Sequence, residues 1–350
     1  MTQNNKKFTE LSELGEFLLI DKLTKDKKIQ NKSSLKGVGD DAAVIKYDEN
    51  EVTLVSNDLL VEGIHFDLMY TPLKYVGYKA VTENVSDIYA MNAKPEQIIV
   101  SFAVSSRFSY EAIDELYAGI YQACNDYGVD LVGGDVTSSK TGMMLSITVL
   151  GKSLPEKISY RNGAKEDDLI CVTGNLGAAY MGLQVLEREK KLSVEPDFKP
   201  NWQGYEYILE RQLRPVARKD IFAFFAENNI VPNAMIDISD GLSSEIIHIC
   251  KESGTGAVIY EERLPIDEQT KNVALEMNMS PTTAAMNGGE DYELLFTIPV
   301  DAKDKITKNK EITVIGSIKN KKEDIKLIAV DGQDYPVLAQ GWNSLTDSEE

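Results

Sequence analysis

Histidine and cysteine are scarce in this sequence. Only two histidines and three cysteines occur among 350 residues, and no CxxC or Cys/His metal-ligand spacing is present. The cysteines, Cys124, Cys171 and Cys250, are far apart and lie among apolar neighbours. An odd number of separated thiols indicates that they are buried and reduced, and that the protein works in a reducing compartment.

Long apolar runs and an excess of basic residues are also missing. Met1 to Phe8 is polar and basic without an apolar stretch, so no signal peptide is expected. No apolar run approaches ~20 residues, so we expect no transmembrane helix and no membrane partner. Lys plus Arg number 37 against 56 Asp plus Glu, a net charge of −19. Non-specific nucleic-acid binding needs a basic footprint, so no nucleic-acid partner is expected, and the composition fits a cytoplasmic protein.

The common motifs for nucleophiles and nucleotides are absent. Without a GxSxG elbow, a Ser-His-Asp hydrolase is unsupported. Gly151-Lys152-Ser153 resembles the end of a P-loop, but a predicted strand precedes it and position 146 is Ser, so Walker A is absent. The segment 174–177 follows a predicted strand and opens a predicted helix, a place where phosphate can bind. A plain strand-to-helix turn explains that segment equally well.

Short acidic clusters beside apolar runs are what the sequence has instead. Six occur, at Gly37–Ile45 (with Asp40 and Asp41), Ser56–Asp58, Val85–Asp87, Gly133–Asp135, Asp237–Asp240 and Gly288–Asp291. Each places a carboxylate at the end of a predicted strand or on a predicted helix, and any one alone is consistent with a surface turn. Neighbouring carboxylates repel, so some are expected to be hydrogen-bonded or to meet a cation. Ligand sets made of oxygen alone suit Mg²⁺ or Ca²⁺.

The length of the chain favours two domains over one. The polar segment 152–168 is the predicted boundary, giving domains 1–152 and 153–350. In the first, residue spacing predicts helices at 8–23, 72–93 and 110–127, strands at 42–46, 52–56, 97–104, 129–132 and 143–150, a loop at 25–35, and turns at 48–50 and 133–135. In the second it predicts strands at 169–173, 235–238, 257–260, 292–298, 312–317 and 325–330, and helices at 178–191, 205–213, 215–228 and 239–250. This alternation indicates an α+β fold with α/β layers.

The predicted helix 72–93 carries polar residues on its apolar stripe. Asn84 and Asp87 share the face of Val76, Ala80 and Ile88. Polar groups that face a core are unfavourable unless they are paired or bind something. A buried hydrogen-bonded pair is one interpretation, and a ligand role is favoured because of the other acidic clusters. Many carboxylates with few bases suggest chemistry in which metals carry the charge, and phosphoryl transfer fits that description.

Seven stretches, taken in order, resemble thiamine-monophosphate kinases, which belong to the superfamily of aminoimidazole ribonucleotide synthetase. They are Gly37–Ala43, Ser56–Phe66, Asn84–Pro95, Leu131–Thr137, Tyr160–Gly163, Asp237–Gly241 and Gly288–Phe296. The resemblance runs from about Phe17 to Trp342. It implies a two-domain aminoimidazole ribonucleotide synthetase-like fold. The N-terminal domain would use a mixed sheet as a homodimer interface, and the C-terminal α/β domain would complete the site. The implied reaction is phosphorylation of thiamine monophosphate by ATP to thiamine diphosphate.

The resemblance also implies roles for individual residues. Ligands to several Mg²⁺ ions would be Asp41, Ser56, Asn57, Asp58, Asp87, Asp135, Asp237 and Asp240, of which Asp58, Asp87 and Asp135 would be catalytic. Asn57 stands where the family usually has Thr. ATP contacts would be Gly134, Asp135, Arg161 and Ser239, and substrate contacts would be His65, Glu290 and Trp342. Arg161 could instead be a surface charge, His65 a packing residue and Trp342 a packed anchor.

A phosphate monoester as acceptor explains the shortage of histidine. Its second pKa is about 6, so it is largely a dianion at neutral pH and needs no general base. Direct in-line transfer between metal-bound oxygens is therefore the expected mechanism.

Other members of the superfamily fit less well. Selenophosphate synthetase expects a reactive Cys near the N-terminus, whereas the first cysteine here is Cys124, and a hydrogenase-maturation relative expects a C-terminal Cys. Aminoimidazole ribonucleotide synthetase matches 56–66 and 288–296 less well. A non-catalytic divalent-cation binder is the alternative from another class, although no EF-hand pattern occurs.

Overall fold

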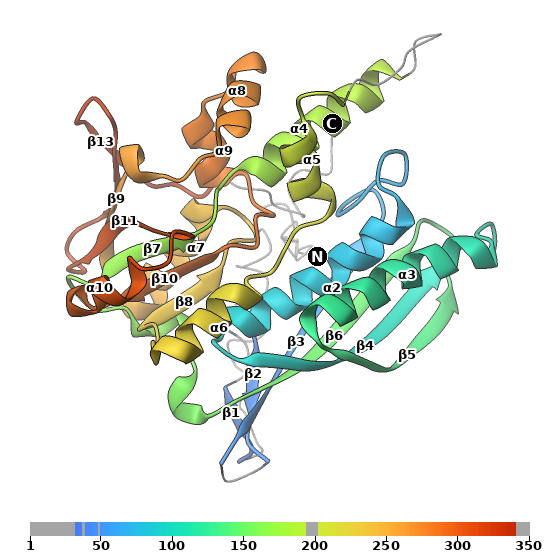
Figure 1. Cartoon of the computed structure of the whole chain (residues 1–350), viewed down its shortest axis with the longest axis horizontal. Coiled ribbons are helices and arrows are strands. Elements are labelled where there is room, and N and C mark those ends of the chain that lie inside the picture. Colours follow the sequence, from blue (N-terminus) through green and yellow to red (C-terminus); the bar gives the residue numbers. More distant parts are fainter. Residues whose placement is uncertain (1–31, 37–38, 48–49, 194–201, 341–350) are drawn as a thin grey trace, which may run out of the picture.

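The computed structural model describes residues 32–36, 39–47, 50–193 and 202–340 (Figure 1). The first domain is built on a six-stranded sheet in the order β1-β2-β3-β6-β4-β5. Its strands are β1 (Ser34–Lys36), β2 (Ala43–Ile45), β3 (Val52–Val61), β4 (Lys94–Val104), β5 (Asp130–Ser138) and β6 (Met144–Ser153). Neighbouring strands are antiparallel except β4 and β5, which are parallel, so the sheet is mixed, as predicted.

Two helices, α2 (Leu73–Ala90) and α3 (Tyr110–Tyr127), cover one face of this sheet (Figure 1). Ser109 caps α3 by accepting a hydrogen bond from the backbone of Ala112, and Gly128 ends it in the left-handed conformation, with φ +73°. The apolar residues of the two helices and of the inner sheet face form one core. Within the described residues, no helix covers the other face of the sheet, toward which every second side chain of each strand points; we call it the open face.

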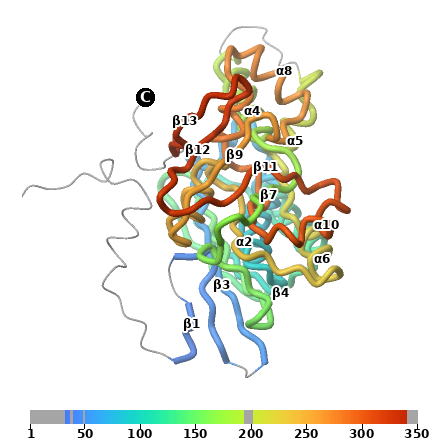
Figure 2. Tube along the Cα trace, turned by 90° about the vertical axis from the view of Figure 1, so that its left-hand side faces the viewer, coloured from blue at the N-terminus to red at the C-terminus, as the bar shows by residue number. Residues whose placement is uncertain are grey.

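The second domain is built on a seven-stranded sheet in the order β13-β12-β9-β11-β7-β10-β8. Its strands are β7 (Leu169–Thr173), β8 (Ala234–Asp237), β9 (Gly256–Tyr260), β10 (Leu294–Ile298), β11 (Ile312–Lys319), β12 (Ile325–Ile328) and β13 (Asp334–Pro336). Its helices are α4 (Ala178–Leu192), α5 (Glu206–Leu213), α6 (Lys219–Asn228), α7 (Leu242–Ser253), α8 (Glu268–Glu276), α9 (Pro281–Asn287) and α10 (Lys303–Ile306). Figure 2 shows the molecule from the side, with β1, β3 and β4 at one end and β13 and α8 at the other.

Helix α2 joins the two domains. Val85 and Ile88 belong to the core of the first domain, whereas Ala90 packs in a second-domain core with Cys171 and Met235. The junction also has a polar contact, because Ser86 Oγ donates a hydrogen bond to Asp237 at the end of β8. Side chains on this helix therefore face the boundary between the domains, where a site can form.

The structure confirms most of the predicted elements and corrects others. Residues 133–135, predicted as a turn, lie inside β5, because that strand pairs with β4 through a bulge. The predicted loop at 25–35 contains the start of β1, and the strand predicted at 52–56 extends to Val61. Helix α6 begins at Lys219 rather than 215, and α8 and α9 were not predicted. The predicted helix 8–23 lies outside the described residues. Within the described ranges, no helix has the length and apolarity needed to cross a bilayer.

Two glycines allow α2 and α3 to approach each other closely. A Cβ on Gly77 would lie 2.1 Å from the carbonyl oxygen of Leu116, and one on Gly119 would lie 1.8 Å from that of Lys74. Both obstacles are backbone atoms, which cannot swing aside as a flexible side chain can. The position of α2, and hence of its polar side chains, depends on this contact.

We predict that Gly119→Ala lowers the stability of the protein. Helix propensity alone would favour alanine by up to ~1 kcal/mol, but overpacking typically costs about 1–3 kcal/mol, and the clash with Lys74 makes packing the larger effect. The measurement is the thermal midpoint, with Glu115→Ala as the control because Glu115 is an exposed position of the same helix. An increase in the midpoint for Gly119→Ala would contradict the close packing of these helices.

Candidate active site

Three carboxylates converge at the junction of the domains. Asp41 precedes β2, Asp87 lies on α2 and Asp237 ends β8, and each offers an oxygen within 4.8 Å of the others. Two serines hold the group in place. Ser56 Oγ on β3 donates to Asp87 Oδ2 at 2.5 Å and to the Asp41 carbonyl at 3.0 Å, and Ser86 Oγ donates to Asp237 Oδ2 at 2.5 Å. We call Asp41, Asp87 and Asp237 the acidic cluster.

The electrostatics of the acidic cluster favour a cation. Burial raises the pKa of Asp87 well above its ordinary value, and the charges of Asp58, Asp237 and Asp41 raise it further. Burial, followed by the charge of Asp41, raises the pKa of Asp237 to about 8. These groups are held as carboxylates only if positive charge is brought to them. An all-oxygen donor set fits Mg²⁺, which is a hard cation.

Arg161 lies against the acidic cluster. Its guanidinium donates to Asp41 from Nε to Oδ2 at 3.2 Å and from Nη2 to Oδ1 at 2.8 Å, and its backbone N–H donates to Asp40. Burial lowers its pKa, but the charge and hydrogen bonds of Asp41 raise it more, so the side chain stays cationic. A paired guanidinium beside a metal site is well placed to contact phosphate oxygens.

The segment that follows Asp237 links the acidic cluster to a cavity. The carboxylate of Glu245, in the first turn of α7, accepts hydrogen bonds from the backbone N–H groups of Ser239 and Asp240, at 3.2 and 2.8 Å. This contact fixes the loop, and both Ser239 and Asp240 line the cavity. The acidic cluster and the cavity are thus two parts of one site.

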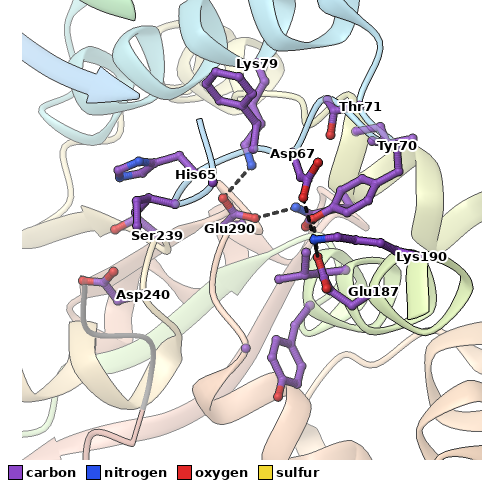
Figure 3. A pocket seen from close by; sticks show the side chains of 18 of the residues that line it. His65, Asp67, Tyr70, Thr71, Lys79, Glu187, Lys190, Ser239, Asp240 and Glu290 are labelled. Carbon is purple, nitrogen blue, oxygen red and sulfur yellow. Dashed lines mark hydrogen bonds and ion pairs between the residues drawn. The ribbon is translucent and has the colours of Figure 1, made fainter. Parts of the chain in front are cut away.

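The cavity has a volume of about 500 Å³ and lies between the domains. Figure 3 shows its labelled lining residues, which are His65, Asp67, Tyr70, Thr71, Lys79, Glu187, Lys190, Ser239, Asp240 and Glu290. Two contacts cross it from the loop before α2 to helix α4, because Tyr70 donates to Glu187 at 2.8 Å and Lys190 to Asp67 at 2.6 Å. His65 also lines the cavity, and its Nδ1 accepts a hydrogen bond from the backbone of Val61.

Several of the residues singled out in the sequence are brought together here. Ser56 contacts Asp87 and Asp41 of the acidic cluster, and Arg161 contacts Asp41. The charge of Asp58 raises the pKa values of Asp87 and Asp237, as close neighbours do. His65, Ser239, Asp240 and Glu290 all line the cavity. Asn84, on the same helix as Asp87, is satisfied internally, since it donates to the Ala80 carbonyl and accepts from the backbone of Asp58.

Other predicted residues lie elsewhere. Asn57 points to the open face of the sheet, away from Ser56 and Asp58, and its amide donates to the neighbouring strand β6. The structure therefore separates Asn57 from the acidic cluster, although the sequence placed it among the metal ligands. Gly134 and Asp135 lie on the edge strand β5, and Asp135 is exposed on the open face opposite Ser101. Trp342 lies outside the described residues.

Several residues of the site were not singled out from the sequence, among them Lys79, Gln212, Tyr70 and Glu187. Lys79 contacts Glu290, Gln212 contacts the same carboxylate, and Tyr70 pairs with Glu187. Only Lys79 carried a signal, because it lies on the buried side of the predicted helix 72–93, three residues after Val76. The others depend on contacts between residues far apart in the chain.

Comparisons with known proteins agree with this arrangement. Residues 39–153 match the family model described as AIR synthase related protein, N-terminal domain. The chain is 37% identical to the thiamine-monophosphate kinase of Buchnera aphidicola subsp. Schizaphis graminum, over 90% of this chain and 94% of the relative. It is 33% identical to that of Aquifex aeolicus, over 95% and 98%.

A solved structure agrees as well. That of AaThiL complexed with AMPPCP and TMP superimposes with a TM-score of 0.80 at 31% identity, covering 96% of this chain and 99% of the other. With relatives so similar over nearly its whole length, the chain belongs to the thiamine-monophosphate kinase family.

Proposed function

We infer that this protein phosphorylates thiamine monophosphate with ATP, giving thiamine diphosphate and ADP. The observation that carries this conclusion is the solved relative complexed with AMPPCP, an ATP analogue, and TMP, whose fold matches this chain almost throughout. The site has the parts that the reaction needs. An acidic cluster lies beside a paired arginine, and a cavity adjoins both.

The acidic cluster is proposed to hold Mg²⁺. Asp41, Asp87 and Asp237 would be ligands, with Asp58, Asp240 and the Ser56 hydroxyl completing the set around several ions. When bound, the metal would neutralise charge on the phosphate oxygens of ATP and the acceptor. Arg161 and Ser239 would hold the nucleotide phosphates in line with the acceptor. Because the acceptor phosphate is already ionised, no side chain has to remove a proton from it.

The cavity is proposed to hold the thiamine part of the substrate. His65 and Glu290 line it, and Trp342 would approach from the C-terminal segment beyond the described residues. A cationic thiazolium is attracted by the carboxylates of the lining and by an aromatic face. Cytoplasmic localisation is proposed because the substrates are metabolites, and the three cysteines are buried and unpaired, as thiols in a reducing compartment are.

A homodimer is proposed through the open face of the first-domain sheet. This face carries the exposed apolar residues Leu59 (53%), Ile99 (37%) and Met144 (36%), which a second copy would cover. The division into domains 1–152 and 153–350 stays a proposal, supported by the end of β6 at Ser153. Asp135 and Gly134 lie beside this face, so we propose that they act in the site of the second copy.

The reaction is tested by a coupled assay with ATP, Mg²⁺ and thiamine monophosphate. ADP release should be seen with thiamine monophosphate and should fall to background with unphosphorylated thiamine, since that alcohol would need a base to deprotonate it. Mass spectrometry should identify thiamine diphosphate as the product. Turnover of thiamine alone, or none of the monophosphate, would contradict the proposed function.

Asp87→Asn is expected to abolish turnover without unfolding the protein. Removing one ligand charge should lower kcat by about 10²–10³-fold or more, by analogy with other electrostatic catalytic groups. Without metal, the variant should unfold at the same temperature as the wild type or higher, because a buried carboxylate that repels its neighbours is removed. The rise in unfolding temperature that Mg²⁺ gives the wild type should be reduced or lost. A variant with wild-type rates would remove Asp87 from the metal site.

The shared site predicts complementation between two inactive chains. In a mixed dimer of Asp135→Asn with Asp87→Asn, one site would have both intact residues if Asp135 acts across the interface. Affinity-purified mixed dimers should then recover about half of the wild-type rate. Each variant alone should be inactive and dimeric by light scattering. A mixed dimer with no activity would place Asp135 in the site of its own chain, and a monomeric wild type would contradict the interface.

A further inference from the structure

Lys79 is a buried cation at the domain junction. It lies on α2 with only 3% of its surface exposed, and its Nζ is 2.5 Å from Glu290 Oε1 and 3.8 Å from Glu83 Oε1. Burial lowers the pKa of a lysine, but these two carboxylates raise that of Lys79 by more, so the ammonium form is kept. A charge buried to this extent is expected to be paired or to serve a function.

The carboxylate of Glu290 is held on both oxygens. Lys79 approaches Oε1 from the first domain, and Gln212 on α5 donates to Oε2 at 2.7 Å from the second. Figure 3 shows Lys79 and Glu290 pointing toward each other among the residues that line the cavity. The carboxylate therefore has a fixed place and direction, set by two helices from different domains.

The backbone of Glu290 is held in an uncommon conformation. Its φ is +57°, and that of Tyr292 is +51°, although neither residue is glycine. The Glu290 N–H donates to the Ser239 carbonyl at 2.7 Å, which ties this strained segment to the proposed nucleotide-binding loop. Strain of this kind persists only where the surroundings impose it, and it gathers at functional sites.

The carboxylate of Glu290 restricts the kind of group that this residue can recognise. A carboxylate only accepts hydrogen bonds, and each of its oxygens has a further lone pair beyond the one used by Lys79 or Gln212. The group that it meets in the cavity must then be an N–H donor or a cation. The exocyclic amine of the thiamine pyrimidine is such a donor.

We propose that Lys79 is a positioning residue that holds the Glu290 carboxylate in place and aimed at the exocyclic amine of the substrate. This inference rests on the proposed function. Lys79 also lies between Glu290 and Glu83, so without it two neighbouring carboxylates would face each other with no cation between them. Lys79 acts through Glu290 and makes no contact of its own with the substrate.

The test is a double-mutant cycle of Lys79→Met and Glu290→Gln. Each single variant should raise KM for thiamine monophosphate by roughly 10- to 100-fold, the range for a lost hydrogen bond to a charged group, with KM for ATP within about twofold. The double variant should bind the substrate no worse than Glu290→Gln alone, because Lys79 then has nothing to position. Lys74→Met, an exposed lysine on the same helix, is the matched control and should leave both constants unchanged.

A substrate analogue gives a readout that loss of stability would not reproduce. Oxythiamine monophosphate has an oxygen in place of the exocyclic amine, so the wild type should discriminate against it in kcat/KM. This discrimination should fall in Lys79→Met to the level of Glu290→Gln. If Lys79→Met does not fold by itself, the same question can be asked in the Glu290→Gln chain, which lacks the negative charge of Glu290. Lys79→Met or Lys79→Gln is then added to that chain.

Two results would overturn the inference. One is a Lys79→Met enzyme that keeps the wild-type KM and discrimination. The other is a further increase in KM when Lys79→Met is added to Glu290→Gln, which would mean that Lys79 contacts the substrate itself. A wild type without activity on thiamine monophosphate would instead refute the proposed function, so the two failures are distinct.

Discussion

The repulsion among Asp41, Asp87 and Asp237 is the constraint on which the site depends. Three carboxylates from a bend, a helix and a strand end lie close enough to share one ion. Two come from the first domain and one from the second, so the charges that repel one another are also those that the domain junction brings together. A cation between them would turn that repulsion into attraction across the junction. The serine hydroxyls hold two of these carboxylates in place, Ser56 that of Asp87 and Ser86 that of Asp237.

Helix α2 carries residues of both parts of the site, the cavity and the acidic cluster. Lys79 lines the cavity and Asp87 belongs to the acidic cluster, and their separation of eight positions corresponds to ~12 Å along a helix. Because one rigid element carries both, the distance between the cavity and the acidic cluster is fixed. The backbone contacts at Gly77 and Gly119 fix the position of α2 against α3, so helix packing away from the site determines the geometry of the site.

The features that could be predicted from the sequence are those that depend on residues close together in the chain. Helix 72–93 followed from its spacing, and Asp87 stood out because it is polar on an apolar stripe. The strand rule could also have separated Asn57 from Ser56 and Asp58, because alternate residues face opposite sides. Residues 133–135 were taken for a turn because glycine pairs are typical of turns, and only pairing with β4 makes them a strand. The contact between Lys79 and Glu290 joins residues 211 apart, which no local pattern reveals.

The distribution of charge separates the two ends of the site. Four carboxylates and two ammonium groups line the cavity, and both ammonium groups are paired with carboxylates of the lining. The remaining negative charge favours a cationic ring and disfavours phosphate. At the other end, Arg161 and a metal on the acidic cluster would supply the positive charge that phosphates need. A substrate with a cationic ring and a phosphate can then bind in one direction only, with its phosphate toward the nucleotide. If the substrate binds in this direction, its phosphate, which is already ionised, meets the nucleotide without a general base, and a site with so little histidine is sufficient.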